Sequence, residues 1–541
     1  MGENTWVSVD MIFKKNNIKN FYQLFSCVAL SLYVFGSIFY LYFSGPLWRD
    51  EIATISFGSA KNFKEFIDLF RYNTIPVAMP IVVKTIGLFS AQWEAYKNIA
   101  VLIGISPVFF IGAIMIKNNP RQSAYLCLLL VLLWQNIRWL NSLRAYGIGL
   151  LSLLIFMYYL QIANRDKQWS WVILLSSLFA AATSYQNWPF IASALGIHCF
   201  FSFKKPAMEK ICHLWAFAAF LLVVLLHFPV LISSNKVFQT MKFPEIGPSD
   251  ILRRWCSVFW MVNPYGTSVL VAFVAFCVFL FLLKQVNNAI KPDSLRLFLI
   301  MFCGTILSFG LLVSSKLVLY EWQFVLPMVF IGFQASLLLT SLVIENTLEK
   351  ILLVAALILP LVPVQRPLNY LFQRCTNLDQ VADLIQQNNS ESDIVIVNPW
   401  EPVISFAYYY KGPCEIISVP PISKYDTHRV DEIQNTMAQP VEEIFKGIDR
   451  KITQTMKNGG RIWLLGEFAP PNNGHPPLSL ELAPSLHWGW RSGPYYQMWS
   501  EHLATILMTR ASSVTRLNAE SDGTHKISAY EHCQVLRFET K

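Results

Sequence analysis

Long apolar runs alternate with short polar segments along the first 366 residues of the chain. A helix needs roughly 20 apolar residues to cross a bilayer. The pattern therefore predicts about eleven membrane-spanning helices, at 21–43, 98–116, 122–138, 141–162, 170–187, 189–203, 211–233, 266–284, 296–314, 324–344 and 350–366. Pro189 predicts a break between the fifth and sixth of these, because proline removes a backbone donor and ends a helix. We expect an α-helical polytopic membrane protein.

The pattern changes in residues 367–541, where polar and apolar positions are mixed and proline-rich connections appear. Short periodic segments predict helices at 377–388, 403–410 and 441–457 and buried strands at 393–397 and 461–465. Helices that alternate with short apolar strands indicate a small α/β domain, and about 175 residues can bury a core of their own. We therefore expect a transmembrane module over 1–366 and a soluble α/β domain over 367–541.

Two adjacent carboxylates, Asp50 and Glu51, follow the first predicted span closely. A charge cluster beside hydrocarbon is costly unless it is solvated or used. Shortly afterwards, segment 61–72 places apolar residues at helical spacing, at Phe63, Phe66, Ile67 and Phe70. That pattern predicts a helix lying in the membrane interface. We therefore expect the first outer loop, 45–97, to hold the two carboxylates at the membrane surface.

Composition and charge support a membrane location. The chain of 541 residues is 54% hydrophobic and 14% charged, with a mean hydropathy of +0.41, whereas soluble proteins usually carry about 25% charged residues. The net charge of +9 does not imply a nucleic-acid partner, because much of the basic excess lies in short loops. These loops precede the first span and follow the second, fourth, sixth and eighth, as expected for cytoplasmic loops.

This alternation predicts which segments lie outside the cytoplasm: the loop 45–97, the loop 234–265, the turn 315–323 and the tail after about residue 366. The first apolar run is long and lacks a small-residue cleavage site, so we expect it to remain as an anchor. The expected location is a bacterial inner membrane, with the N-terminus cytoplasmic and the tail periplasmic. Ten cysteines include no C-x-x-C pair, so no metal or redox motif is visible. The sequence leaves open a disulfide among Cys375, Cys414 and Cys533.

Several stretches of the chain resemble a known family. The run Trp-Arg-Asp-Glu at 48–51 is similar to the signature of C-type glycosyltransferases, multi-spanning enzymes that take a sugar from a polyprenyl-phosphate donor. The closer branch includes protein O-mannosyltransferases and bacterial lipid A aminoarabinose transferases. Segment 142–146 resembles an Arg-x-Tyr motif that opens the fourth span, and 323–327 stands where many relatives have Arg-Tyr-Leu-Leu-Pro. Segments 393–397 and 408–410 resemble the small extracytoplasmic domain of bacterial members.

Two departures from the family pattern bear on the chemistry. Gln323 replaces a frequent arginine, which puts one contact to the donor phosphate in doubt. Segment 134–141 contains no carboxylate, whereas branches that bind a divalent metal usually carry a second acidic motif near there. The resemblance therefore favours a reaction without a cofactor, and leaves dependence on Mg²⁺ or Mn²⁺ open.

The resemblance implies a role for each acidic residue. Asp50 would be the base that deprotonates the acceptor hydroxyl, and Glu51 would bind sugar or tune the charge beside it. Two close carboxylates repel, which tends to raise the pKa of one of them. The residues alone leave a second interpretation of Asp50, in which it caps a helix that begins at Glu51.

Candidate contacts to the donor phosphate or lipid lie near the outer ends of the spans: Arg49, Arg138, Arg144, Tyr146, Arg253, Arg254 and Lys316. Arg144 either matches phosphate with its forked guanidinium or extends its charge to water. Arg253 and Arg254, beside tryptophans, either bind an anionic lipid head group or belong to an interfacial aromatic belt. Lys316 has the alternative of pairing with Glu321.

The resemblance implies a single displacement with inversion at the anomeric carbon, on the non-cytoplasmic face. The expected partners are the polyprenyl-phosphate-linked sugar, membrane lipids and an acceptor that is a glycan, a lipid or a protein. The main rival is a transporter or flippase for a lipid-linked or anionic solute. It predicts polar residues near the middle of the membrane and two related halves, and neither is visible. A catalytically inactive scaffold is a third hypothesis; the intact Asp50 and Glu51 argue against it, and Gln323 leaves it open.

Overall fold

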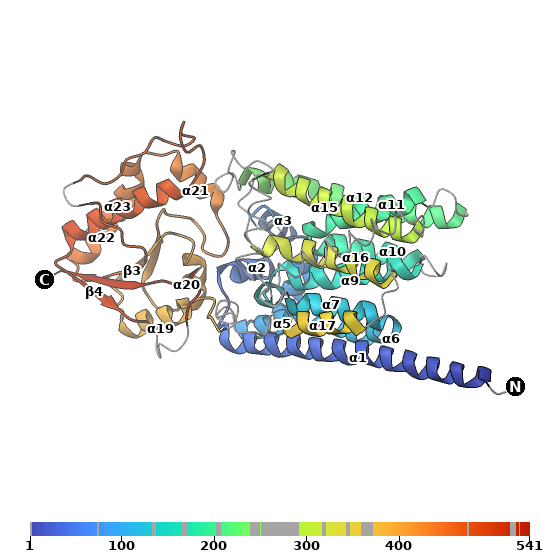
Figure 1. Ribbon diagram of the computed structural model, residues 1–541. Coiled ribbons are helices and arrows are strands. Elements are labelled where there is room, and N and C mark those ends of the chain that lie inside the picture. The colour runs from blue at the N-terminus through green and yellow to red at the C-terminus, as the bar shows by residue number, and fades with distance from the viewer. Residues whose placement is uncertain are drawn as a thin grey trace.

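The computed structural model is mostly helical and ends in a mixed α/β region. It describes residues 3–72, 75–132, 137–163, 170–201, 207–237, 249, 292–315, 321–341, 347–358, 372–472, 475–519, 526–529 and 531–540. The helical part and the α/β region lie side by side (Figure 1). Helices α2 (Arg49–Ser59) and α3 (Phe63–Leu69), in the segment predicted to form the first outer loop, lie at the end of the helical part that faces the α/β region (Figure 1).

Five described stretches of helix are long and apolar enough to cross a membrane: Asn17–Phe43, Trp93–Asn118, Ala145–Ile162, His213–Ser234 and Leu295–Leu312. Each falls on a predicted span. They belong to α1 (Glu3–Phe43), α5 (Trp93–Phe110) with the π turn Ile111–Met115 and α6 (Ile116–Asn118), α9 (Ala145–Ala163), α12 (Ala207–Val237) and α15 (Pro292–Ser315). Their length and composition indicate a multi-pass membrane protein.

Shorter helices occupy the other predicted spans that the structure describes: α7 (Pro120–Leu132), α8 (Ile137–Leu140), α10 (Ser170–Thr183), α11 (Trp188–Phe201), α16 (Val325–Ser341) and α17 (Thr347–Ile358). The predicted break at Pro189 is confirmed, because a 3₁₀ turn over Tyr185–Asn187 separates α10 from α11. Gln323 lies in a second 3₁₀ turn, Glu321–Phe324, which directly precedes α16. The predicted span at 266–284 lies outside the described residues.

The core of the helical part forms where α1 packs against α5 and α7, and α5 against α9. Tyr33 on α1 is buried and donates a hydrogen bond to the Gly104 carbonyl on α5 at 3.2 Å. On α12, by contrast, large apolar side chains such as Leu225 and Leu226 are exposed. An exposed apolar surface of this kind is typical of a helix that faces lipid.

The α/β region contains a five-stranded sheet in the order β2-β1-β3-β5-β4. β1 (Ile394–Asn398) pairs in parallel with β2 (Glu415–Ser418) and β3 (Ile462–Gly466). β5 (Val535–Glu539) pairs antiparallel with β3 and with β4 (Ser513–Leu517). Every residue of β1 is buried, as expected for a central strand with both faces covered.

The helices of this region are α19 (Leu378–Asn388), α20 (Val403–Tyr409), α21 (Val430–Met437), α22 (Val441–Lys457) and α23 (Gly493–Arg510). The predicted helices at 377–388, 403–410 and 441–457 are confirmed as α19, α20 and α22, and the predicted strands as β1 and β3. Gly459 ends α22 because its positive φ of 76° suits glycine. The sequence patterns did not predict α21, α23 or the other three strands.

The interfacial helix predicted at 61–72 is shorter than expected. α3 begins after Asn62, whose side chain accepts a hydrogen bond from the Glu65 N–H at 2.9 Å. This is the N-cap that asparagine commonly provides. A further short apolar helix, α4 (Ala78–Phe89), follows it and packs against α2.

The apolar residues of α3 divide between two environments. Phe66 and Phe70 pack against Phe57 of α2, with ring centroids 5.9 and 5.1 Å away. Phe63 and Ile67 remain 77% and 43% exposed. Phe66 and Phe70 therefore pack α3 against α2. Phe63 and Ile67 form an exposed apolar surface that suits a membrane interface.

Two hydrogen bonds to backbone carbonyls join the α/β region to the segment before α2. The Cys375 N–H donates to the Ser44 carbonyl at 2.7 Å, and the Tyr409 hydroxyl donates to the Leu47 carbonyl at 2.7 Å. The thiols of Cys375, Cys414 and Cys533 are buried and free. No disulfide therefore joins these three residues.

Candidate active site

The first turn of α2 places Asp50 differently from the helix-capping interpretation. The helix begins at Arg49 with Trp48 as its N-cap residue, so Asp50 lies inside the first turn and the capping interpretation is wrong. Glu51 takes the capping role instead, because its Oε2 accepts a hydrogen bond from the Trp48 N–H at 3.3 Å. Both carboxylates are favoured at this position by the positive end of the helix dipole.

Asp50 meets basic groups from three parts of the chain. Its Oδ1 lies 3.2 Å from Nε2 of His428 and 3.8 Å from Nε of Arg49. Nη1 of Arg144 donates to the Asp50 backbone carbonyl at 3.4 Å. The Asp50 side chain keeps 22% of its surface exposed. The site therefore combines α2, the segment before α9 and the α/β region.

These basic groups decide the charge of Asp50. Burial alone would raise the pKa of its carboxyl, but the hydrogen bond from His428 and the charges of Arg144 and Arg49 outweigh burial and hold the pKa well below its usual value. Asp50 is consequently ionised at neutral pH.

Glu51 has a different environment from its neighbour. Its side chain is fully buried, and Oε2 lies 3.5 Å from Nζ of Lys97, whose side chain is 2% exposed on α5. Oε1 accepts a hydrogen bond from the Leu143 N–H at 2.9 Å. Lys97 also donates to the Tyr40 hydroxyl at 3.4 Å. Glu51 thus connects α2 to α5 and to the segment that carries Arg144, and Lys97 extends the connection to α1.

The other predicted donor contacts fall into three groups. Arg144 and Tyr146 lie together next to Asp50, with the two side chains within hydrogen-bonding reach. Arg138 is 3% exposed, with its guanidinium over the rings of Trp48 and Trp139 and Nη1 donating to Ser528 of the α/β region at 3.1 Å. The remaining three, Arg253, Arg254 and Lys316, lie outside the described residues.

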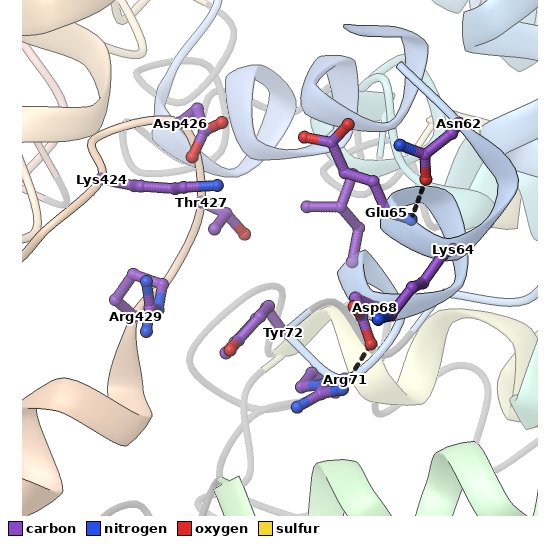
Figure 2. A pocket seen from close by; sticks show the side chains of 11 residues that line it. Asn62, Lys64, Glu65, Asp68, Arg71, Tyr72, Lys424, Asp426, Thr427 and Arg429 are labelled. Carbon is purple, nitrogen blue, oxygen red and sulfur yellow. Dashed lines mark hydrogen bonds and ion pairs between the residues drawn. The ribbon is translucent and has the colours of Figure 1, made fainter. Parts of the chain in front are cut away.

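A polar pocket of about 330 Å³ lies between α3 and the loop that precedes α21. Figure 2 shows its walls, with Lys64, Glu65 and Asp68 on the α3 side and Lys424 and Asp426 on the other. Two residues of the loop wall, Thr427 and Arg429, are the sequence neighbours of His428. The pocket is therefore lined by both sequence neighbours of the residue that contacts Asp50.

Glu531 of the α/β region supports the start of α2. Its Oε2 accepts a hydrogen bond from the Arg49 N–H at 3.4 Å, and its Oε1 accepts one from the Ser405 hydroxyl at 2.8 Å. Burial raises the pKa of Glu531 to about 7, although Arg49 and the hydrogen bonds act in the opposite direction.

Sequence patterns did not single out His428, Lys97 or Glu531. Lys97 is the last residue of the predicted first outer loop, 45–97, immediately before the predicted span 98–116. A lysine at a span boundary, shortly after two carboxylates, is a signal that could have identified it. His428 and Glu531 belong to no motif, and only folding brings them to α2.

The arrangement offers two chemical capabilities. An ionised carboxylate with accessible surface can orient a hydroxyl group and accept its proton, and Arg49 and Arg144 can stabilise an anion beside it. Within the described ranges, no group of three or more His, Cys, Asp and Glu residues is arranged to hold a metal ion.

Comparisons with known proteins assign no family to this chain. No protein-family model matches it, and a search among curated proteins finds no match.

Proposed function

We propose that this protein is an integral membrane glycosyltransferase that moves a sugar from a polyprenyl-phosphate donor to an acceptor. The observation that supports this function most is the environment of Asp50, an ionised carboxylate beside His428, Arg49 and Arg144. Transfer from a lipid phosphate requires a base for the acceptor hydroxyl and fixed cations for the departing phosphate.

The proposed reaction is a single displacement. The acceptor hydroxyl gives its proton to Asp50 while its oxygen attacks the anomeric carbon of the donor. The bond between that carbon and the phosphate oxygen breaks, and polyprenyl phosphate leaves with the electron pair. Arg144 and Arg49 stabilise the charge on the departing phosphate, since guanidinium groups match phosphate oxygens in geometry. The configuration at the anomeric carbon inverts.

His428 holds Asp50 in a weakly basic form, because the hydrogen bond that it makes lowers the pKa of Asp50. In the proposed reaction, the acceptor hydroxyl replaces His428 as the hydrogen-bond donor to Asp50. Loss of the His428 bond then raises the pKa of Asp50 and makes it a better proton acceptor.

Glu51 acts as a positioning residue in this proposal. Its side chain is fully buried and paired with Lys97, so it has no open surface toward a substrate. Its bond to the Leu143 N–H holds the residue next to Arg144. Through this bond, Glu51 keeps Arg144 beside Asp50.

The proposal includes a membrane topology of about eleven spans in a bacterial inner membrane, with a cytoplasmic N-terminus and a periplasmic α/β region. One feature of the fold supports this orientation: α1 runs from the N-terminus at one end of the helical part toward the α/β region at the other end (Figure 1). Asp50 contacts His428 of that region, so the reaction is assigned to the periplasmic face.

Turnover of labelled donors by the purified full-length protein tests the function. The assay measures sugar transfer and release of free sugar from a panel of radiolabelled polyprenyl-phosphate sugars, for wild type and Asp50→Asn. We expect turnover of at least one donor, reduced roughly 10²–10⁴-fold in Asp50→Asn because general-base catalysis contributes about that factor. Donor binding should be retained.

Asp449→Asn is the matched control, because Asp449 is an exposed carboxylate whose partner, Arg510, lies 3.3 Å away on α23. It should leave turnover unchanged. Undiminished turnover in Asp50→Asn would exclude Asp50 as the base. Donor binding with movement across a liposome membrane, but no turnover, would favour the transporter hypothesis.

A further inference from the structure

The polar pocket beside His428 has two walls from distant parts of the chain. One wall consists of α3 and the residues that follow it, and the other is the loop before α21. Its volume of about 330 Å³ lies at the lower end of the range for small-molecule sites, roughly 300–1,000 Å³. In Figure 2, the side chains of the two walls face one another across the open space.

Thr427 provides an independent indication of a ligand. The residue is 2% exposed, and its Oγ1 has no hydrogen-bond partner among the described residues. Figure 2 shows its hydroxyl oxygen directed from the loop wall toward the α3 wall. Buried hydroxyl groups normally have a partner, and each exception needs an explanation. A ligand in the pocket would supply that partner.

The charges of the lining are nearly balanced. Both walls carry both signs: Lys64, Arg71, Lys424 and Arg429 are the cations, and Glu65, Asp68 and Asp426 are the anions. Two of the cations are already paired, Arg71 with Asp68 and Arg429 with Asp431. Lys424 and Asp426 form no ion pair within the described part of the chain and are free to meet a ligand. Such a mixture of donors and acceptors, with Leu69 as its one aliphatic lining residue, suits a molecule with many hydroxyl groups.

The apolar residues of α3 and the residues of α3 that line the pocket are different sets. Phe63 and Ile67, the exposed apolar residues of α3, suit the membrane interface. The charged residues Lys64, Glu65 and Asp68 of the same helix line the pocket. The pocket therefore suits a ligand that arrives from water.

We propose that this pocket binds the acceptor, and that the acceptor is a hydrophilic glycan. This proposal rests on the glycosyltransferase function proposed above and selects one class among the acceptors that the sequence left open. A glycan in the pocket lies against Thr427 and Arg429, on either side of His428. From there, one of its hydroxyl groups reaches Asp50 by displacing His428, whose Nε2 is 3.2 Å from the Asp50 carboxylate.

Glycan binding can be measured without turnover. The full-length Asp50→Asn protein in detergent is applied to an array of lipid-free oligosaccharides, and the best binder is titrated by calorimetry. We expect binding to at least one glycan. Thr427→Val should weaken it by about 2- to 10-fold, the effect of one neutral hydrogen bond. The double variant Lys424→Ala/Asp426→Ala should weaken it by more than about tenfold, because two donor or acceptor groups are removed.

Thermal stability and a matched control separate binding from folding. Thr427→Val should leave the melting temperature unchanged or higher, because valine has the same shape and the lost hydroxyl has no described partner. Thr509→Val, on the exposed surface of α23, should not change glycan binding. Absence of binding to every glycan, or unchanged affinity in both pocket variants, would overturn the proposal.

Hydrolysis of the donor distinguishes this proposal from the proposed function. Slow release of free sugar uses water as acceptor and does not need the pocket. If hydrolysis depends on Asp50 but no glycan binds, the glycosyltransferase function stands and the glycan pocket is wrong. If a glycan binds the pocket but no donor turns over, the pocket is a carbohydrate site in a protein of another function.

Discussion

Two adjacent carboxylates form the inner and outer sides of the first turn of α2, and they differ in burial and in charge partner. The inner side is Glu51, fully buried and paired with Lys97 in the helical part. The outer side is Asp50, 22% exposed and in contact with His428 of the α/β region. Successive residues of a helix point about 100° apart, so one carboxylate enters the packed bundle and the other faces the neighbouring region.

One turn of helix can thus hold a carboxylate in a fixed position and present a second carboxylate to a substrate. A buried ion pair with additional hydrogen bonds keeps a fixed position, because moving either charge would leave the other uncompensated. The partly exposed carboxylate exchanges its partners more easily. In the proposed function, the sequence pair Asp-Glu therefore contains a positioning residue and a reactive residue, and the direction of each side chain decides which is which.

Removing the inner carboxylate should have the largest effect on stability. Glu51→Ala leaves Lys97 buried without its partner, and breaking a buried pair in this way typically costs about 3–5 kcal/mol. The double variant Glu51→Leu/Lys97→Met should recover most of that loss, because an apolar pair needs no charge compensation. Thermal unfolding of the purified proteins in detergent measures both.

Glu51→Gln adds a test of the assigned role. Glutamine retains much of the shape but removes the charge. A normal melting temperature together with complete loss of donor turnover would contradict a positioning role and place Glu51 in the chemistry.

Stability should also depend on pH through Glu531 of the α/β region, which accepts a hydrogen bond from the Arg49 N–H at the start of α2. The pKa of Glu531 rises from 4.5 to about 7 on folding. The stabilisation that this shift provides is therefore complete below pH 4.5 and is lost as pH rises through 7. The change amounts to roughly 3 kcal/mol, since each pKa unit corresponds to about 1.4 kcal/mol.

Melting temperatures between pH 5 and pH 8 test this dependence. They should fall with rising pH in wild type and change less in Glu531→Gln. Glu442→Gln, an exposed position on α22, serves as the control and should follow wild type. An equal slope in wild type and Glu531→Gln would show that Glu531 titrates no differently in the folded protein.

The smallest effect concerns the contact between His428 and Asp50. In the proposed reaction the active form of Asp50 is the ionised one. Its lowered pKa should therefore place the acidic limb of the pH profile of kcat/KM below the usual carboxylate range. His428→Ala removes the largest of the interactions that lower this pKa. The acidic limb should then move to higher pH.

Initial rates of donor turnover, measured over a series of acidic pH values, locate the acidic limb of the pH–rate profile. His475→Ala, another substitution of a tail histidine, should leave its position unchanged. A limb that stays in place in His428→Ala would mean that the contact with His428 does not determine the basicity of Asp50.

Local patterns explain why much of the fold could be predicted from the sequence. The five long apolar helices, the break at Pro189 and the helix α22 each depend on the periodicity or backbone of neighbouring residues. Elements without such periodicity could not be predicted. The edge strand β4 is one of them, because four of its five residues are exposed and its register depends on β5.

The candidate site shows the same division. The sequence by itself determined that Asp50 and Glu51 stand together after an apolar span, with Arg49 beside them, because these are neighbours in the chain. Tertiary structure alone decided that Glu51 pairs with Lys97, that Asp50 meets His428, and that a polar pocket forms between α3 and the loop before α21. The physical reason is that burial and charge pairing depend on segments far apart in the sequence, which only packing brings together.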